Sequence, residues 1–83
     1  MDASMILYIK PGCPWCVAVE EYLTKHQYKY QRVNVFANPA HFAEMKQLSG
    51  QHYAPTMTVN GKILADFDVE QLSEFLSKHQ ITP

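Results

Sequence analysis

The first hydrophobic pattern along the chain is an uninterrupted apolar run. It covers residues 5–9, Met-Ile-Leu-Tyr-Ile, and the residues Lys10, Pro11 and Gly12 end it. Apolar side chains at every position, without alternation, are typical of a strand that is buried on both faces of a sheet. We therefore predict a strand in a central position over residues 5–9.

A helical pattern follows this strand and begins at Pro14. Proline is favoured at the first position of a helix, because its missing N–H would have no partner there. Apolar residues then recur at helical spacing: Cys16, Val19 and Leu23, with Tyr22 beside them. Charged residues occupy positions that we expect to face water: Glu20, Glu21 and Lys25.

The middle of the chain predicts a second strand and a second helix. Residues 28–35 are rich in Tyr and Val, which favour strands. Asn38-Pro39 then predicts a helix start, and Gly50 predicts its end, because glycine readily adopts the left-handed conformation that terminates helices. The apolar stripe of this helix consists of Phe42, Met45 and Leu48.

The last third of the chain predicts a hairpin and a third helix. Asn60-Gly61 separates two strand-like segments, 56–59 and 62–65, and both residues tolerate the positive φ of a tight turn. Asp68 and Gln71 have the spacing of a capping box, which predicts a helix start at Asp68. The residues expected on the buried face of this helix are Val69, Leu72, Phe75, Leu76 and His79.

The order of these elements is strand, helix, strand, helix, strand, strand, helix. The first three form a βαβ unit, whose strands are parallel with a right-handed crossover. The closing hairpin adds an antiparallel pair. We therefore predict an α/β fold, βαβαββα, with a four-stranded mixed sheet flanked by helices, in one domain over residues 1–83.

Composition and charge narrow the classes of function. Seven Lys and Arg residues nearly balance eight Asp and Glu residues, which gives a formal net charge of −1. A nucleic-acid-binding domain usually has a basic face, so we expect no nucleic-acid partner. The apolar run at 5–9 is far shorter than the roughly 20 residues that span a bilayer. We expect a cytoplasmic monomer without membrane contact, in a compartment that keeps thiols reduced.

The two cysteines are placed where thiol chemistry is favoured. Cys13 follows a central strand and precedes the predicted helix, so it occupies the N-cap, where its sulfur can accept hydrogen bonds from the N–H groups of Trp15 and Cys16. The positive end of the helix dipole also favours a thiolate there. Cys16 lies within the first turn and is expected to be more buried. We therefore expect Cys13 to attack a substrate disulfide and Cys16 to resolve the mixed disulfide.

A structural zinc site is the alternative for a Cys-x-x-Cys motif. Zinc needs four ligands, usually from two such pairs or from one pair and two histidines at close spacing. The chain has one pair, and its histidines lack that spacing: His26, His41, His52 and His79. We therefore expect no metal site.

The segment Lys10-Pro11-Gly12-Cys13-Pro14-Trp15-Cys16 resembles the active-site motif of dithiol glutaredoxins, which have the thioredoxin fold. Leu48-Ser49-Gly50-Gln51, Ala54-Pro55 and Asn60-Gly61-Lys62 also match segments of that family, so the resemblance covers nearly the whole chain. It implies a disulfide oxidoreductase with glutathione as reducing co-substrate and disulfide-bearing proteins as partners, and a cis bond before Pro55. The implied glutathione-binding residues are Lys10, Trp15, Tyr53, Ala54, Pro55, Asp68 and Val69.

The roles of two aromatic residues stay open. Trp15 contacts a partner protein or only shields the disulfide, and Tyr53 lines the glutathione groove or covers the core.

Two departures from the family pattern keep other functions open. Tyr53-Ala54 replaces the usual Thr-Val before the proline, and residues 65–67 replace the Gly-Gly before the last helix. Asp66 then adds a negative charge near the expected place of the glutathione carboxylates. This charge favours the related redoxins that thioredoxin reductase reduces and that serve ribonucleotide reductase. A third possibility is a carrier of an iron–sulfur cluster, against which Pro14 argues.

Overall fold

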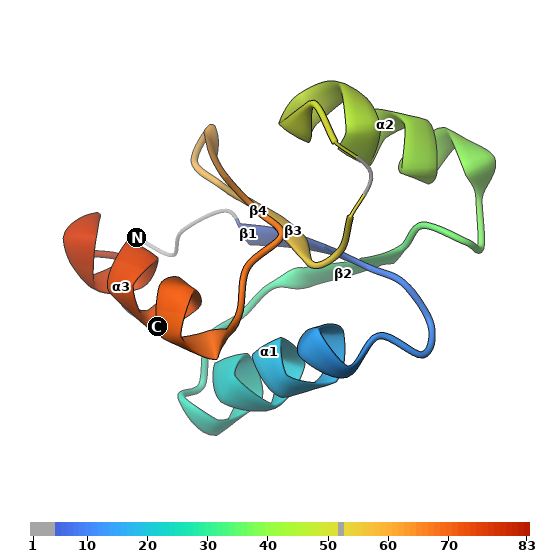
Figure 1. Cartoon of the computed structure of the whole chain (residues 1–83). Helices are drawn as coiled ribbons and strands as arrows, with labels where there is room; N and C mark the ends of the chain where they lie inside the picture. Colours follow the sequence, from blue (N-terminus) through green and yellow to red (C-terminus); the bar gives the residue numbers. More distant parts are fainter. Residues whose placement is uncertain (1–4, 52) are drawn as a thin grey trace.

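The computed structural model describes residues 5–51 and 53–83. Its strands and helices follow the predicted order, which confirms the α/β fold with a four-stranded mixed sheet (Figure 1). The elements are β1 Met5–Ile9, α1 Pro14–Lys25, β2 Gln31–Asn34, α2 Pro39–Ser49, β3 Thr56–Val59, β4 Lys62–Ala65 and α3 Val69–Lys78. In the described part of the chain, no helix has the length and apolar character needed to cross a membrane.

The sheet has the strand order β2-β1-β3-β4. β1 pairs in parallel with β2 and antiparallel with β3, and β3 pairs antiparallel with β4. Helices α1 and α3 lie on one face of the sheet and α2 lies on the other (Figure 1). Because β1 and β2 are parallel, the loop from β1 to α1 and the turn from β2 to α2 leave the sheet at the same end of the strands.

The central strand β1 is buried on both faces, which explains its uninterrupted apolar run. Met5, Leu7 and Ile9 face the main core, which α1 and α3 cover. Tyr8 faces a smaller core under α2. The other members of the main core include Cys16, Val19, Leu23, Met57, Val59, Phe67, Leu72 and Leu76. The smaller core also contains Val33, Val35 and Met45.

The predicted turn and capping signals are confirmed. Asn60 and Gly61 have φ angles of 52° and 85°, so both residues of the β3–β4 turn adopt the left-handed conformation. The Asn38 side chain accepts a hydrogen bond from the Ala40 N–H at 2.9 Å and caps α2. Gly50 ends that helix with a φ of 70°. Each of these signals acts within a few residues, so the sequence alone was enough to place them.

The second strand is shorter than the predicted 28–35, because β2 covers only Gln31–Asn34. The backbone N–H of Tyr28 donates to the Leu23 carbonyl at 2.9 Å, so it belongs to the end of α1. The Tyr28 hydroxyl donates to the Ile81 carbonyl at 3.0 Å. The tyrosines that suggested a strand instead pack against the main core from the α1–β2 connection.

The predicted apolar stripe of α2 is wrong at one position. Met45 is fully buried, but Leu48 is 40% exposed and Phe42 is only half-buried. The smaller core on this face of the sheet is narrow, with four buried residues. It therefore covers a single line of α2 positions and leaves the neighbouring apolar side chains at the surface.

Candidate active site

Cys13 is the N-cap residue of α1, as the sequence predicted. Its backbone is extended, with φ −89° and ψ 110°, and Pro14 takes the first helical position. Its Sγ accepts a hydrogen bond from the Cys16 N–H at 3.1 Å, one of the two bonds that capping predicted. The side chain is partly exposed. The sulfur thus lies where backbone donors stabilise negative charge and where a substrate disulfide can reach it.

Cys16 has the opposite environment. Its side chain is only 2% exposed and belongs to the main core. Burial, and then a hydrogen bond with Cys13, raise the pKa of the Cys16 thiol to about 12. Both cysteines are free thiols in this structure. The two sulfurs therefore have unequal environments: the Cys13 sulfur is partly exposed and accepts a backbone hydrogen bond, whereas the Cys16 thiol is buried and protonated at neutral pH.

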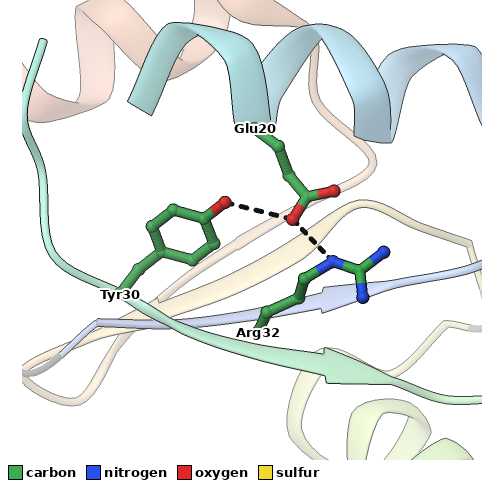
Figure 2. Close-up of polar contacts among 3 residues, drawn as sticks. All are labelled: Glu20, Tyr30 and Arg32. Carbon is green, nitrogen blue, oxygen red and sulfur yellow. Dashed lines mark hydrogen bonds and ion pairs between the residues drawn. The ribbon is translucent and has the colours of Figure 1, made fainter. Parts of the chain in front are cut away.

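Glu20 lies one turn after Cys16 on α1 and ties that helix to the sheet. Its Oε1 accepts hydrogen bonds from the Tyr30 hydroxyl at 3.0 Å and from Arg32 Nε at 2.7 Å (Figure 2). The prediction that Glu20 faces water is therefore wrong, since its side chain is only 21% exposed. Tyr30 and Arg32 come from the α1–β2 connection and β2, so this contact appears only in the folded chain. The Glu20 charge also contributes to the raised pKa of Cys16, after burial and Cys13.

The segment before β3 lies directly beside the Cys13 sulfur. The Ala54–Pro55 peptide bond is cis, as the family resemblance implied. The Cys13 thiol lies 3.8 Å from the Ala54 carbonyl oxygen, and Pro55 is buried. The Pro55 carbonyl accepts the Asp66 N–H at 3.0 Å, which ties this segment to the end of β4. Two segments that are about 40 residues apart in the chain therefore form one site.

Two residues that the sequence did not single out hold this segment in place. The Thr56 hydroxyl is fully buried and donates to the Tyr53 carbonyl at 2.9 Å. The Gln51 amide donates to the Tyr53 carbonyl and to Thr56 Oγ1, both at 3.1 Å. These bonds fix the approach to Pro55. The sequence carried only a weak signal for Thr56, a polar residue at the start of an apolar strand.

A small acidic pocket lies on the α3 side of Cys13. It has a volume of about 190 Å³, and its lining consists of Trp15, Asp66, Phe67, Asp68 and Gln71. Trp15 is 61% exposed, as expected for a residue beside the sulfurs. Asp66 has a φ of 53°, the left-handed conformation that glycine favours. The chain thus keeps a glycine-like backbone at this position but adds a carboxylate to the pocket.

The start of α3 caps itself. The Asp68 carboxylate accepts the Gln71 N–H at 2.8 Å, and the Gln71 side chain accepts the Asp68 N–H at 3.0 Å. The predicted capping box is therefore confirmed. The Asp68 N–H, which lies at the start of a helix, therefore already has a partner within the chain.

The other residues that the resemblance implied as glutathione-binding make the following contacts. The ammonium group of Lys10 lies 5.2 Å from the centroid of the Phe42 ring, on the α2 side. Tyr53 is 54% exposed, so it does not cover the core. Val69 is half-buried and packs against the main core. His52 lies outside the described residues.

The asymmetry of the two sulfurs predicts selective alkylation. At pH 7, iodoacetamide in less than stoichiometric amount is expected to modify Cys13 at least about ten times more than Cys16, because alkylation requires an accessible thiolate. In Cys13→Ser, modification of Cys16 is expected to keep rising above pH 10, since burial is the largest cause of its raised pKa. Peptide mapping by mass spectrometry measures both. Equal modification of the two cysteines at pH 7 would contradict the assignment.

Solved structures show the same architecture. The thioredoxin-like protein BC3987 superimposes with a TM-score of 0.79 and 27% identity, over 88% of this chain and 100% of that one. NrdH-redoxin from Escherichia coli has a TM-score of 0.72 and 17% identity, over 86% of this chain and 92% of that one. These matches confirm the thioredoxin-like fold.

Sequence comparison identifies the family. The family model for glutaredoxin matches residues 5–64, which include both cysteines, the cis-proline and the β3–β4 turn. An uncharacterized glutaredoxin-like 8.6 kDa protein of the rubredoxin operon of Clostridium pasteurianum is 31% identical over 72 residues, which cover 87% of this chain and 96% of the relative. The chain therefore belongs to the glutaredoxin family of thioredoxin-fold redox proteins.

Proposed function

We propose that this protein reduces disulfides in other proteins, with Cys13 as the nucleophile and Cys16 as the resolving thiol. The observation that carries the proposal is the unequal pair of sulfurs at the mouth of α1. Cys13 is partly exposed and accepts a backbone hydrogen bond at 3.1 Å, whereas Cys16 is 2% exposed with a raised pKa. The same proposal places the protein in the cytoplasm, where thiols are kept reduced.

The reaction balances in two exchanges. The Cys13 thiolate attacks one sulfur of the substrate disulfide, the substrate S–S bond breaks, and the second substrate sulfur leaves as a thiolate. Cys16 then gives up its proton, attacks the Cys13 sulfur and releases the first substrate sulfur. The substrate gains two electrons from the two cysteines, one proton from Cys16 and one proton from the solvent, and the protein is left with a Cys13–Cys16 disulfide. The Ala54 backbone beside Cys13 supports this scheme, because an extended substrate segment can pair with it like an added strand.

We further propose that a flavoprotein reductase of the thioredoxin reductase type returns the electrons, in preference to glutathione. Two carboxylates, from Asp66 and Asp68, line the pocket where the family resemblance puts a carboxylate of glutathione. The Asp68 N–H is also occupied by the Gln71 side chain. The fold of NrdH-redoxin, a glutaredoxin-like protein with a thioredoxin-like activity profile, is consistent with this choice.

A comparison of two reducing systems tests this choice of reductant. The oxidised protein is mixed with NADPH and either thioredoxin reductase or glutathione with glutathione reductase. We expect faster NADPH oxidation with thioredoxin reductase. Efficient reduction by glutathione, with none by thioredoxin reductase, would support the second candidate, a glutathione-dependent glutaredoxin. Membership in the glutaredoxin family favours this candidate.

Asp66 is expected to be one cause of poor glutathione use. Asp66→Asn removes the charge and keeps a side chain that tolerates positive φ. Two negative charges about 4 Å apart in water repel each other by about 1 kcal/mol. Without the repulsion between Asp66 and a carboxylate of glutathione, the variant is expected to react with glutathione about fivefold faster. The rate of reduction of the Cys13–Cys16 disulfide by glutathione measures this gain.

Glu74→Gln is the matched control for that variant, because Glu74 is an exposed carboxylate of α3 outside the pocket. It removes the same charge and is expected to leave the rate nearly unchanged. The gain in Asp66→Asn is also expected to shrink at high salt, because salt screens exposed charges. An equal gain in both variants would mean that overall charge, not the pocket, sets the rate.

A further inference from the structure

A group of exposed and half-buried aromatic and basic side chains lies on the α2 side of the active-site loop. This basic aromatic patch consists of Lys10, Phe36, Phe42 and Lys46. The Phe36 and Phe42 rings are stacked, with centroids 6.0 Å apart and an angle of 6° between their planes. The ammonium groups of Lys10 and Lys46 lie 5.2 Å and 5.7 Å from the centroid of the Phe42 ring. Phe36 is 61% exposed, and the proposed chemistry makes no use of it.

The patch borders a hollow that is large enough for a side chain of a partner. The hollow has a volume of about 420 Å³, and its lining consists of Val35, Phe36, Pro39, Phe42, Ala43 and Lys46. No acidic residue is among these described lining residues. Glu44 of the same helix is engaged elsewhere, because it accepts the Tyr8 hydroxyl at 2.7 Å and lies 3.8 Å from His41 Nδ1. The patch therefore presents positive charge together with apolar surface.

The patch is continuous with the loop that carries the nucleophile. Lys10 directly follows β1, and the Val35 N–H donates to the Ile9 carbonyl at 3.0 Å, which fixes the end of β2 beside the end of β1. Lys10 precedes Cys13 by three residues, a span of at most about 11 Å. The β1–α1 loop and the β2–α2 turn lie at the same end of the molecule (Figure 1). A substrate bound at Cys13 can therefore reach the patch within a few residues.

We infer that the basic aromatic patch docks an acidic segment of the protein substrate, which carries a carboxylate and an aromatic or branched aliphatic side chain near its reacting cysteine. This inference rests on the proposed function. The lysines attract the carboxylate, and the stacked rings and the hollow take up the apolar side chain. Asp66 and Asp68 lie in the pocket on the α3 side of Cys13. The two sides of the site thus carry opposite charges, which orient the substrate with its acidic segment toward α2.

The inference is tested with peptides of matched sequence. Each peptide has one cysteine, held as a mixed disulfide with thionitrobenzoate, and one flanking segment, either Asp-Phe-Glu or Lys-Phe-Lys, before or after the cysteine. Reduced protein is mixed with each peptide in a single turnover, and release of thionitrobenzoate is followed by absorbance. Cys13 attacks the peptide sulfur and thionitrobenzoate leaves, so the rate measures docking and attack without any second reductant. We expect the acidic peptide to react about tenfold faster at low salt.

The variants Lys46→Glu and Phe36→Ser are expected to reduce this preference to about twofold or less. Salt of about 0.5 M is expected to have the same effect on the parent protein. Lys62→Glu and Ile63→Ser are the matched controls, because they change an exposed lysine and an exposed apolar residue on β4 that belong neither to the patch nor to the lining of the hollow. Circular dichroism checks that each variant is folded.

The possible outcomes separate the two proposals. An unchanged preference in Lys46→Glu and Phe36→Ser, or an equal loss in the controls, would overturn the docking role. If the parent protein dimerises and the Phe36→Ser variant is monomeric, the docking role would also be overturned, because a second copy would then occupy the patch. A folded parent protein that reacts with none of the peptides would remove the proposed function, and the docking role with it.

Discussion

The Cys13→Ser variant is expected to lose disulfide reduction by at least about a thousandfold, whereas Cys16→Ser keeps the first exchange. A serine hydroxyl is not ionised at neutral pH and does not attack a disulfide. The Cys16 thiol is buried and protonated, so it does not replace the Cys13 thiolate. Insulin reduction, with dithiothreitol as the source of electrons, measures the loss. This assay does not depend on which physiological reductant the protein uses.

The two cysteine variants serve as controls for each other, because both replace sulfur by oxygen at positions three residues apart. Cys16→Ser attacks the substrate but cannot resolve the product, so a mixed disulfide with Cys13 is expected to accumulate. Mass spectrometry under non-reducing conditions detects it. A trapped complex in Cys13→Ser but not in Cys16→Ser would reverse the assigned roles.

Leu23→Ala is expected to lower the free energy of unfolding by about 2–5 kcal/mol. Leu23 is fully buried in the main core, between α1 and the sheet, so truncation leaves a cavity there. A loss of this size is a large part of the roughly 5–15 kcal/mol that stabilises a domain. Urea unfolding, followed by far-ultraviolet circular dichroism, measures the change.

Leu48→Ala is the matched control, since it deletes the same atoms from a leucine that is 40% exposed. Its expected cost is below about 1 kcal/mol. The comparison also tests the correction to the predicted face of α2. Equal losses of unfolding free energy in the two variants would mean that the Leu48 side chain is buried in solution and that its exposed position in the structure is wrong.

Local signals in the sequence predicted most of the elements that build the site. Asn38, the Asn60-Gly61 pair and the Asp68–Gln71 box act through hydrogen bonds or backbone angles within four residues, so neighbouring sequence is enough to specify them. The N-cap position of Cys13 also follows from Pro14 and the strand before it. The unequal environments of the two sulfurs were predictable on the same grounds.

Contacts between distant segments were not predictable in this way. The tyrosines at 28 and 30 have strand propensity, but the end of α1 and the Glu20 carboxylate determine where they lie. Leu48 fits a helical stripe, but the narrow core under α2 leaves it exposed. Propensity and periodicity describe a segment by itself and contain no information on how wide the opposing surface is.

The sequence by itself determined the order of strands and helices, the helix caps and the N-cap position of the Cys13 sulfur, because each depends on near neighbours in the chain. The tertiary structure alone decided what surrounds that sulfur. It brings the Ala54 carbonyl to 3.8 Å from Cys13, joins the Asp66 N–H to the Pro55 carbonyl, and stacks Phe36 on Phe42 beneath Lys10. The proposals on reductant and substrate rest on these contacts, because charges and rings from different elements meet only when the sheet and its two layers are assembled.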